Sequence, residues 1–499
     1  MTDRCRIRKE VYLPALNSIV EKIKSYPLIQ KLYRLSTESA GGVFLVGGSV
    51  RDLMGGCFDG KDFDVALQSD PLTCAQVLAQ QVQGSVVRLH EGFGQYRVVK
   101  IEEGEPLTID LARIKGKTIE EDLTRRDFTI NAMAIDLGVL FKTGSLDLID
   151  PLGGLKDLRE KRVKHSAPSA LRDDPVRIMR GIRIARKYGF TINLSLKKAM
   201  REDRELLTET APERIRAELF KIMDVRGIYH SLALLQEVGI LEILIPEVSA
   251  FHECKQGDHH RYDLWEHSLR TAREIESVLE GIKRLWPASS PLLNNYFQGW
   301  VEGDVRQSTL LKFTAFLHDI GKPMTKRMEE GRIRFFGHEL EGGMINRKVA
   351  RRFKLGKKAQ RYMETITNNH MRILNLALAP RITQRAKYRF FRDLGNTGLD
   401  ILLLSLADAS ATGKDREGTE EYGKIASTVD SFMDYYFTEF GRKPTRPLLS
   451  GHDIMQIFGM TQGARVGELL TMVKEAEAQG EVATREEAIA FLKGRVSCG

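Results

Sequence analysis

Residues 41–67 read GGVFLVGGSVRDLMGGCFDGKDFDVAL, and this stretch decides the fold of the N-terminal part of the chain. The apolar run VFLV and the later FDVAL predict two strands, separated by a glycine turn and a helix that carries Arg51. Side chains at i and i+2 of a strand point to the same face, so we expect Asp62 and Asp64 to lie side by side. Two carboxylates that close repel each other unless a cation joins them. The stretch therefore predicts a cation site on one face of a sheet.

The composition is that of a soluble globular protein with several domains. The chain has 499 residues, of which 42% are hydrophobic and 29% charged, and a net charge of +9 that permits a polyanionic partner. No apolar run approaches the roughly eighteen residues of a membrane span, and MTDRCRIRKE is not a signal peptide. The five cysteines show no paired spacing. We therefore expect no membrane association, no zinc ribbon and no disulfide framework, and a reduced cytoplasmic setting.

The chain changes character near residue 150. Residues 1–40 predict a helical extension, and residues 41–150 contain the strand patterns VFLV, FDVAL, SVVRL, YRVVKI and LTIDLARI. From residue 151 onward strands are expected to stop, because helical patterns such as APERIRAELFKIM and GIYHSLALLQEVGILEIL dominate. The predicted fold class is α+β: a small mixed sheet with helices, followed by a mostly α-helical remainder.

A third acid and a glycine pair extend the predicted cation site. Asp110 lies in TIDLARI, another predicted strand, so three carboxylates could converge on one sheet face. Such a set can hold two Mg²⁺ ions about 3.5–4 Å apart, and oxygen ligands without Cys or His favour magnesium over zinc. Gly47 and Gly48 stand between a strand and a helix, where backbone amides can approach a phosphate. The alternatives are a solvated acidic pair and an ordinary turn.

Two arginine-rich segments follow. In DLTRRDFTINAMAID, Arg125 and Arg126 could neutralise a triphosphate while Asp127 and Asn131 brace the turn; a capped helix with exposed arginines is the alternative. In RDDPVRIMRGIRIAR, Asp173 or Asp174 is predicted to cap a helix that has Pro175 in its first turn. Three arginines follow on one helix face: Arg177, Arg180 and Arg183. Like charges stacked in this way need a polyanion or interleaved acids to offset them.

These segments resemble those of the class II tRNA nucleotidyltransferase and bacterial poly(A) polymerase family. The matching segments, in family order, are LVGGSVRD with KDFDVA, RRDFTINAMAID, DPLGGLKDLREKRVKH, DDPVRIMRGIRIARKYGF and APERIRAELFKIM. The resemblance covers roughly residues 41–250. It implies a nucleotidyltransferase head with a palm fold over 41–150, and a helical neck with a nucleotide-template and RNA-binding region over 151–250.

The resemblance also implies roles for individual residues. Asp62 and Asp64 would be the Mg²⁺-binding pair and Asp110 the third catalytic acid. The incoming nucleotide would be contacted by Gly47, Gly48, Arg51, Arg126 and Asn131. The protein template that pairs with cytosine or adenine would consist of Asp174 and Arg177, supported by Arg180 and Arg183. The family commonly has Glu before the template Asp, whereas this chain has the shorter Asp173.

The implied reaction is the addition of nucleotides to an RNA 3′ end without a nucleic-acid template, with release of pyrophosphate. Only LARIKGKTIEEDLTR separates Asp110 from Arg126, where the family usually has a longer flexible loop associated with switching from C to A recognition. In the family, this deletion is associated with enzymes that add C alone. We therefore expect a tRNA CC- or C-adding enzyme that uses the tRNA 3′ end and CTP, with ATP as a second candidate nucleotide. Full CCA addition and poly(A) synthesis are the alternatives.

Histidines mark a second chemical unit. Seven of the eleven lie between His252 and His370, FLHDIGKP places His318 beside Asp319, and Asp408 follows the apolar run LLLLSLA. A buried carboxylate is costly unless a charge meets it. Imidazole and carboxylate ligands from several helices suit a divalent transition metal, and two ions are conceivable.

These residues resemble the HD phosphohydrolase superfamily. The implied ligands are His267, His318, Asp319 and Asp408, with His338 and His370 as the additional ligands of two-metal members. The resemblance implies an HD domain over 251–430 that binds a metal such as Mn²⁺, Ni²⁺ or Fe²⁺ and hydrolyses a phosphoester, followed by a helical tail over 431–499. A purely structural metal site is the alternative. For the whole chain, the alternatives are a phosphohydrolase with a non-catalytic nucleotide-sensing head and a non-catalytic RNA-binding protein. The sequence predicts neither the HD substrate nor the oligomeric state.

Overall fold

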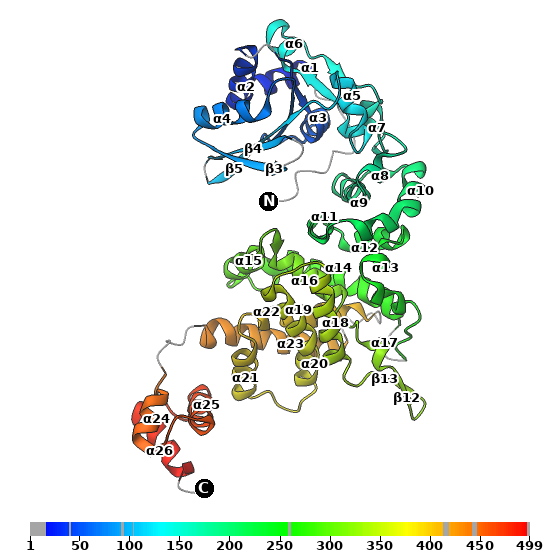
Figure 1. The fold of residues 1–499 in the computed structure, drawn as a ribbon. Helices are drawn as coiled ribbons and strands as arrows, with labels where there is room; N and C mark the ends of the chain where they lie inside the picture. Colours follow the sequence, from blue (N-terminus) through cyan, green and yellow to red (C-terminus); the bar gives the residue numbers. More distant parts are fainter. Residues whose placement is uncertain are drawn as a thin grey trace. The chain divides into compact units, whose positions relative to one another are not determined.

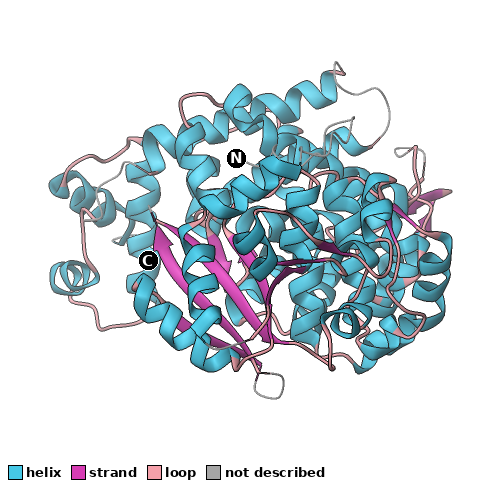
Figure 2. Ribbon diagram, turned by 90° about the horizontal axis from the view of Figure 1, so that it is seen from above, coloured by secondary structure: helices cyan, strands magenta, loops and turns pink. Residues whose placement is uncertain are grey.

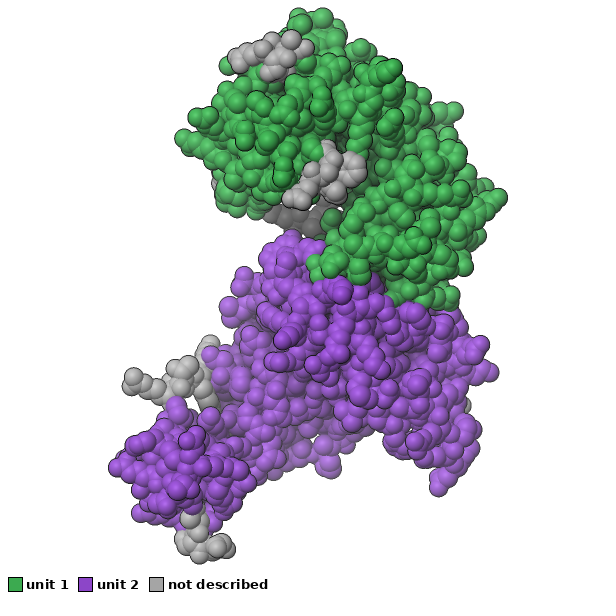
Figure 3. All heavy atoms as spheres, in the orientation of Figure 1, with its two compact units in different colours: residues 1–226, 234–244 green, residues 227–233, 245–499 purple. Residues whose placement is uncertain are grey.

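The chain folds into two compact units (Figure 3). A computed structural model describes residues 16–38, 41–90, 94–102, 104–257, 261–412, 419–441 and 447–496. Unit 1 comprises residues 1–226 and 234–244, and unit 2 comprises residues 227–233 and 245–499. Within the described residues, no helix combines the length and hydropathy that a membrane crossing requires.

Unit 1 contains a seven-stranded sheet with the order β3-β4-β5-β2-β1-β6-β7 (Figures 1 and 2). Its strands are β1 (Val43–Val46), β2 (Asp62–Leu67), β3 (Ser85–His90), β4 (Gln95–Glu102), β5 (Glu105–Arg113), β6 (Ala134–Asp136) and β7 (Leu148–Ile149). Strands β2 and β5 pair in parallel, and the other neighbours pair antiparallel. The sheet is therefore mixed, and the predicted α+β fold class is confirmed, as are the five strands expected from VFLV to LTIDLARI.

In the described part of unit 1, seven α-helices accompany this sheet. They are α1 (Leu16–Ser25), α2 (Pro27–Glu38), α3 (Gly47–Met54), α4 (Pro71–Val82), α5 (Ile119–Thr124), α6 (Leu137–Thr143) and α7 (Gly154–Arg159). Every residue of β1 is buried, because this strand lies in the sheet interior between β2 and β6. Since β1 leads directly into α3, the glycine pair lies at the end of a buried strand, next to the start of β2.

The remainder of unit 1 is mostly helical. Its elements are α8 (Ala170–Asp173), α9 (Val176–Tyr188), α10 (Leu194–Asp203), α11 (Pro212–Asp224), α12 (Ile228–Glu237), which spans residues of both units, and α13 (Ile240–Leu244). Pro175 directly precedes α9, and no side chain caps this helix. The predicted cap by Asp173 or Asp174 is therefore wrong: Asp173 ends α8, and the Asp174 carboxylate instead accepts a hydrogen bond from Arg214 at 2.9 Å.

Unit 2 is built mainly from helices. They are α14 (Leu264–Leu285), α15 (Ser290–Gln298), α16 (Gln307–Phe316), α17 (Lys322–Thr325), α18 (His338–Arg352), α19 (Lys357–Asn369), α20 (Met371–Ala377), α21 (Gln384–Leu394), α22 (Thr397–Ala411) and α23 (Glu420–Tyr435). Helix α22 is buried over almost its whole length because it packs against α14, α19 and α23. This environment explains its nearly continuous apolar sequence.

The expectation that strands stop after residue 150 is wrong in detail. Six short strands follow in the described part of the chain: β8 (Arg162–Val163), β9 (Thr191–Ile192), β10 (Trp300–Glu302), β11 (Val305–Arg306), β12 (Arg327–Glu329) and β13 (Arg332–Arg334). Each has only two or three residues, which is too short for an alternating pattern to be visible in the sequence.

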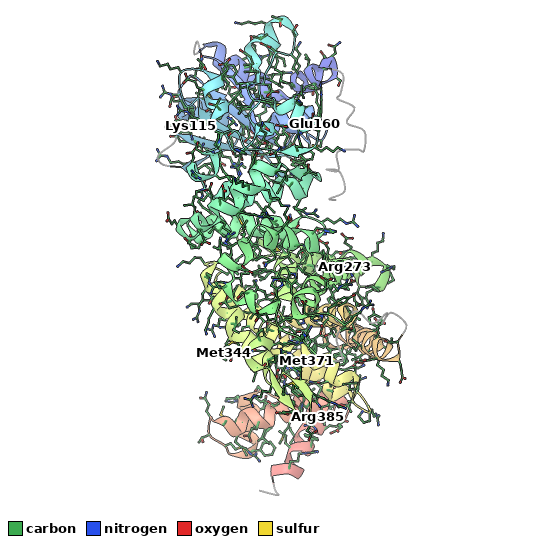
Figure 4. The ribbon with its side chains drawn as sticks, turned by 90° about the vertical axis from the view of Figure 1, so that its right-hand side faces the viewer. Lys115, Glu160, Arg273, Met344, Met371 and Arg385 are labelled. Carbon is green, nitrogen blue, oxygen red and sulfur yellow. The ribbon has the colours of Figure 1, made fainter. Side chains whose placement is uncertain are left out.

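The C-terminal helices form a small subdomain with its own apolar core. They are α24 (Gly451–Phe458), α25 (Ala464–Gln479) and α26 (Arg485–Val496). The buried Glu475 of α25 accepts hydrogen bonds from three arginines of α21: Arg385, Arg389 and Arg392. Hydrogen bonds from Arg389 first and then from Arg385 lower the pKa of Glu475 to about 2, against the effect of burial. Arg385 is labelled in Figure 4. A charge cluster therefore joins α25 to α21.

Candidate active site and metal centre

The three predicted head acids lie on one face of the sheet. Asp62 and Asp64 are two residues apart in β2, and the parallel register pairs Asp64 with Asp110 of β5. Side chains of paired positions project from the same face, as do those at i and i+2. The geometry on which the sequence argument depended is therefore present.

Asp64 lies against the glycine turn. The Gly48 amide donates a hydrogen bond to Asp64 Oδ2 at 2.9 Å. A Cβ atom at Gly47, where φ is +66°, would lie 3.0 Å from both Asp64 Oδ2 and Arg126 Nη1. Only glycine therefore permits this approach. Burial, with the charge of Asp62 added, raises the pKa of Asp64 to about 6, against the opposing charge of Arg126. Asp62, Asp64 and Arg126 thus share one electrostatic environment.

The third acid has a cationic partner that the sequence analysis missed. Arg97 of β4 donates to both oxygens of Asp110, at 2.6 and 2.7 Å, because the two residues are paired across adjacent strands. The only sequence signal for this contact is the arginine in YRVVKI, whose partner depends on the strand register. Among the described residues, both sets of three metal-ligating atoms within 4.8 Å of one another lie in unit 2, not at the head acids.

Two residues predicted to contact the nucleotide are engaged inside unit 1. Arg51 is buried; it donates to Asn131 Oδ1 and to the Tyr188 hydroxyl, both at 2.6 Å, and pairs with Asp52 at 2.8 Å. The Asn131 amide in turn donates to Asp127 at 3.0 Å. These contacts brace α3 against α9 and the turn after α5. Direct contact of Arg51 or Asn131 with a nucleotide stays a prediction.

The arginines of α9 have partners within unit 1. Arg177 donates to the carbonyl oxygens of Ala170 and Arg125, Arg180 pairs with Asp127, and Arg183 pairs with Glu218. Acids of other elements thus offset the charges of Arg180 and Arg183, which is one of the two alternatives drawn from the sequence, whereas Arg177 is held by carbonyl oxygens. The Asp127 carboxylate raises the pKa of Arg180, and the Asp64 carboxylate adds to this effect. Helix α9 therefore lies within electrostatic range of the head acids.

The six predicted HD ligands come from five regions of unit 2 and converge. They are His267 in α14, His318 and Asp319 after α16, His338 at the start of α18, His370 between α19 and α20, and Asp408 in α22. Two groups of potential ligands result, and both include Asp319: one with His267 and His318, the other with His338 and His370.

Asp319 lies between two histidine pairs. Its Oδ2 atom is 3.1 Å from His318 Nε2 and 3.5 Å from His267 Nε2. Its Oδ1 atom is 3.3 Å from His338 Nε2 and 3.4 Å from His370 Nε2. One carboxylate therefore presents one oxygen to each histidine pair, so Asp319 could contribute a ligand to both groups.

The histidine tautomers suit metal binding. Nδ1 of His318, His338 and His370 lies 2.7–2.8 Å from the carbonyl oxygen three residues earlier in each case. A carbonyl oxygen only accepts, so Nδ1 carries a proton in each ring, and Nε2 is the nitrogen that can bind a metal ion once it has released its own proton. His338 Nε2 and His370 Nε2 face each other at 3.2 Å. Two opposed lone pairs are unfavourable unless a cation joins them, so the donor set fits a metal ion.

The charges at this centre favour a cation. Burial alone would lower the pKa of His318, but the carboxylates of Asp319 and Asp408 raise it to about 10. Asp408 Oδ1 lies 3.4 Å from His318 Nε2. Lys322, which the sequence analysis did not single out, places Nζ 2.6 Å from Asp319 Oδ2 and donates to Gln256. The sequence feature that could have indicated Lys322 is its position in FLHDIGKP, three residues after Asp319.

Both units contain segments that match known protein families. Family models match three segments: "Poly A polymerase head domain" at residues 43–164, "Probable RNA and SrmB- binding site of polymerase A" at 189–251, and "HD domain" at 264–430. Among solved structures, a CCA-adding enzyme in its apo form superimposes with a TM-score of 0.65 at 20% identity, covering 97% of each chain. At this identity the similarity concerns the fold.

Two curated relatives have similar identity to the chain. It is 31% identical over 457 residues to the CC-adding tRNA nucleotidyltransferase of Thermus thermophilus, covering 90% of this chain and 92% of the relative. It is also 31% identical over 464 residues to the A-adding tRNA nucleotidyltransferase of Deinococcus radiodurans, covering 91% and 95%. With the polymerase head and HD domain matched in order, the chain belongs to the family of tRNA nucleotidyltransferases and poly(A) polymerases.

Proposed function

We propose that the chain is a tRNA nucleotidyltransferase that adds C residues to the tRNA 3′ end. The observation that carries this proposal is the alignment of Asp62, Asp64 and Asp110 on one sheet face, beside the Gly47 turn and Arg126. A non-catalytic RNA-binding protein or a nucleotide sensor has no need for clustered acids where RNA phosphates would lie, because like charges repel.

In this proposal the three acids hold Mg²⁺, for which their hard oxygen donors are suited. When bound, Mg²⁺ supplies positive charge and Lewis acidity for attack by the RNA 3′-hydroxyl on the α-phosphate of the nucleotide, with pyrophosphate leaving. The Gly48 amide fixes the orientation of Asp64. Arg126 offers a fixed positive charge to the triphosphate, and Asp174 with Arg177 reads the base edge.

Restriction to C rests on the short connection between Asp110 and Arg126. Strand β5 ends at Arg113 and α5 begins at Ile119. Backbone amides in this connection are tied to the start of α5: Lys115 donates to Asp122 and Lys117 to Glu121, both at 2.9 Å. A short, hydrogen-bonded connection leaves little chain to rearrange for a second nucleotide. The name of the Thermus relative agrees with this choice, whereas that of the Deinococcus relative favours A addition.

The test is nucleotide incorporation into tRNA that lacks its CCA end, with Mg²⁺ and labelled CTP or ATP. Incorporation of C alone supports the proposal. Incorporation of C followed by A indicates full CCA addition, A alone indicates an A-adding enzyme, and a long A tail indicates poly(A) synthesis; each result would overturn C restriction. If nothing is incorporated, the nucleotidyltransferase proposal itself is wrong and the sensing-head alternative gains support.

We also propose that the HD centre is a metal-dependent phosphohydrolase. The supporting observation is Asp319, which presents one oxygen to each of two histidine pairs. A transition metal such as Mn²⁺, Ni²⁺ or Fe²⁺ suits these imidazole and carboxylate donors, and when bound it activates water for attack on a phosphoester. Hydrolysis of p-nitrophenyl phosphate or a 2′,3′-cyclic nucleotide with added Mn²⁺, lost in His318→Ala, is expected. Metal binding without hydrolysis of either would indicate a structural site.

A further inference from the structure

The hydroxyl of Ser49 holds the backbone of β2 at both of its acids. Strands β1 and β2 stop pairing at Leu45 and Val65, so the ladder ends before it reaches Asp64. Ser49 lies in the first turn of α3 and is only 2% exposed. Its Oγ atom accepts a hydrogen bond from the Asp64 amide at 2.7 Å and donates one to the Asp62 carbonyl at 3.2 Å. One side chain therefore takes the place of a paired strand at the two acids.

A second hydroxyl orients the carboxylate of Asp62. Thr108 of β5 lies directly opposite Asp62 in the parallel register, so the two side chains project from the same face of the sheet. The Thr108 hydroxyl donates a hydrogen bond to Asp62 Oδ1. The terminal torsion of an aspartate is broad, so an unrestrained carboxylate samples many orientations. The contact with Thr108 therefore restricts the directions in which the Asp62 oxygens point.

These contacts leave one oxygen of each acid available. The Gly48 amide bonds Asp64 Oδ2, and the Thr108 hydroxyl bonds Asp62 Oδ1. Within the part of the chain that the structure describes, no hydrogen-bond donor reaches Asp64 Oδ1 or Asp62 Oδ2. Carboxylate oxygens are the ligands that a hard cation such as Mg²⁺ prefers. The hydrogen bonds thus present one defined oxygen of each acid to a cation.

We propose that Ser49 and Thr108 are positioning residues of the nucleotidyltransferase centre, which fix the carboxylates of Asp62 and Asp64 in the orientation that binds Mg²⁺. Neither hydroxyl has to contact the nucleotide or the RNA. Ligands that are already oriented need no rearrangement when charge develops, and a displacement of about 1 Å can cost roughly 10²-fold in rate. This role rests on the proposed nucleotidyltransferase function and names the side chains that orient its metal-binding pair.

Thr108→Val removes the hydroxyl and keeps a β-branched side chain of similar shape. The Mg²⁺ concentration that gives half of the maximal rate of C incorporation should rise about threefold to tenfold, the range that loss of one hydrogen bond predicts. The KM for tRNA should not change. Thr108→Ser keeps the hydroxyl and should restore the wild-type value. The control is Thr191→Val on β9, an exposed threonine whose hydroxyl donates to the Lys161 carbonyl.

Ser49→Ala removes both backbone contacts. The Asp64 amide and the Asp62 carbonyl then lose their partner, so β2 can shift at the acids, and kcat for C incorporation should fall about tenfold. The KM for tRNA should again stay the same. The matched control is Ser405→Ala in α22, a buried serine whose hydroxyl donates to the Ile401 carbonyl. It should incorporate C at the wild-type rate.

Thermal unfolding with added Mg²⁺ provides a readout that does not depend on catalysis. A cation that binds the folded state raises the melting temperature. In Asp64→Asn, the remaining rise measures Mg²⁺ bound outside the head acids, and the excess of the wild type over this variant measures the head site. The excess should shrink in Thr108→Val and Ser49→Ala and persist in Thr108→Ser and in both controls.

An unchanged Mg²⁺ requirement together with an unchanged excess in both variants would overturn the positioning role, even when the wild type incorporates C. A lower melting temperature without Mg²⁺, with rate and Mg²⁺ effects as in the wild type, would show that the hydroxyls only stabilise the fold and would overturn it as well. If the wild type incorporates no nucleotide, the proposed function fails. The melting-temperature comparison would still decide separately whether the two hydroxyls orient a cation site.

Discussion

Arg97 holds both carboxylate oxygens of Asp110, at 2.6 and 2.7 Å, across the antiparallel pair β4 and β5. Asp110 is itself paired with Asp64 on the other side, across β2 and β5. Arg97, Asp110 and Asp64 thus occupy paired positions on the three neighbouring strands β4, β5 and β2. Arg97 therefore supplies part of the positive charge that the acidic face needs, and a metal ion can supply the same charge.

Replacement of Arg97 tests this balance. Arg97→Gln leaves Asp110 without its partner beside Asp64, so the melting temperature should fall. The decrease in the free energy of unfolding should be ~1 kcal/mol or less, because the ion pair is partly exposed. Mg²⁺ should raise the melting temperature more in the variant than in the wild type, because a cation that binds the folded state stabilises it. Thermal unfolding with and without Mg²⁺ measures both effects, with the exposed Arg113→Gln as control. Equal Mg²⁺ effects in all three proteins would argue against a shared acidic site.

Arg177→Ala tests the template assignment. A bidentate contact to a base edge is worth about 1–3 kcal/mol of discrimination, so the ratio of kcat/KM for CTP to that for UTP should fall about fivefold or more. The affinity for tRNA should change little, and the exposed Lys198→Ala on α10 is the control. Because Arg177 also donates to the Arg125 carbonyl, kcat is expected to fall as well. Equal losses of selectivity and tRNA affinity would contradict the assigned role.

The local rules of the sequence predicted those features that depend on spacing along one element. The alternation within FDVAL placed Asp62 and Asp64 on the same face, and the adjacency of His318 and Asp319 predicted the centre of the HD cluster. The helices after residue 150 could be predicted in the same way, because the apolar periodicity that indicates a helix is a property of each helix by itself.

Features that depend on register or on contacts between distant elements could not be predicted. The partner of Arg97 depends on how β4 pairs with β5, and the burial of Arg51 depends on Tyr188, which lies 137 positions further along the chain. The cap expected from Asp174 failed because Arg214 of α11 offers this carboxylate a charged donor. The β12–β13 hairpin was missed because its strands are too short to show a period.

Asp400 is a buried acid of unit 2 outside the metal centre. The hydroxyls of Tyr296 and Tyr362 donate to its carboxylate at 2.6 Å, and Gln307 donates at 3.0 Å. Burial raises the pKa of Asp400 to about 6 despite these hydrogen bonds. The folded protein therefore binds a proton here in a pH range where the unfolded chain has released it.

This raised pKa predicts a pH dependence of stability. Between the ordinary pKa near 3.8 and the folded value near 6, the folded state binds more protons than the unfolded state, so stability should fall as pH rises through this window and level off above it. The loss should be about 2–3 kcal/mol. Asp400→Asn does not titrate, so the wild type should lose stability relative to this variant between about pH 4 and about pH 6, and the difference should level off above that range. Urea unfolding at several pH values measures the difference in the free energy of unfolding between the two proteins. A difference that does not change with pH would contradict the raised pKa of Asp400.

Metal content tests the HD cluster independently of activity. Because Asp319 belongs to two groups of potential ligands, the wild type should retain up to two Mn²⁺ ions per chain after loading and gel filtration. His370→Ala should retain one fewer, since it removes a ligand from only one group. Elemental analysis by mass spectrometry measures the content, with His452→Ala on α24 as control. Identical content in all three proteins would show that the cluster does not bind metal in this way.

The most direct measurement of the central claim is C incorporation into tRNA lacking its CCA end by two variants, Asp64→Asn and Asp319→Asn. If the head acids form the nucleotidyltransferase centre, Asp64→Asn abolishes incorporation of labelled CTP while Asp319→Asn incorporates it at the wild-type rate. Undiminished incorporation by Asp64→Asn, or its loss in Asp319→Asn alone, would contradict the account.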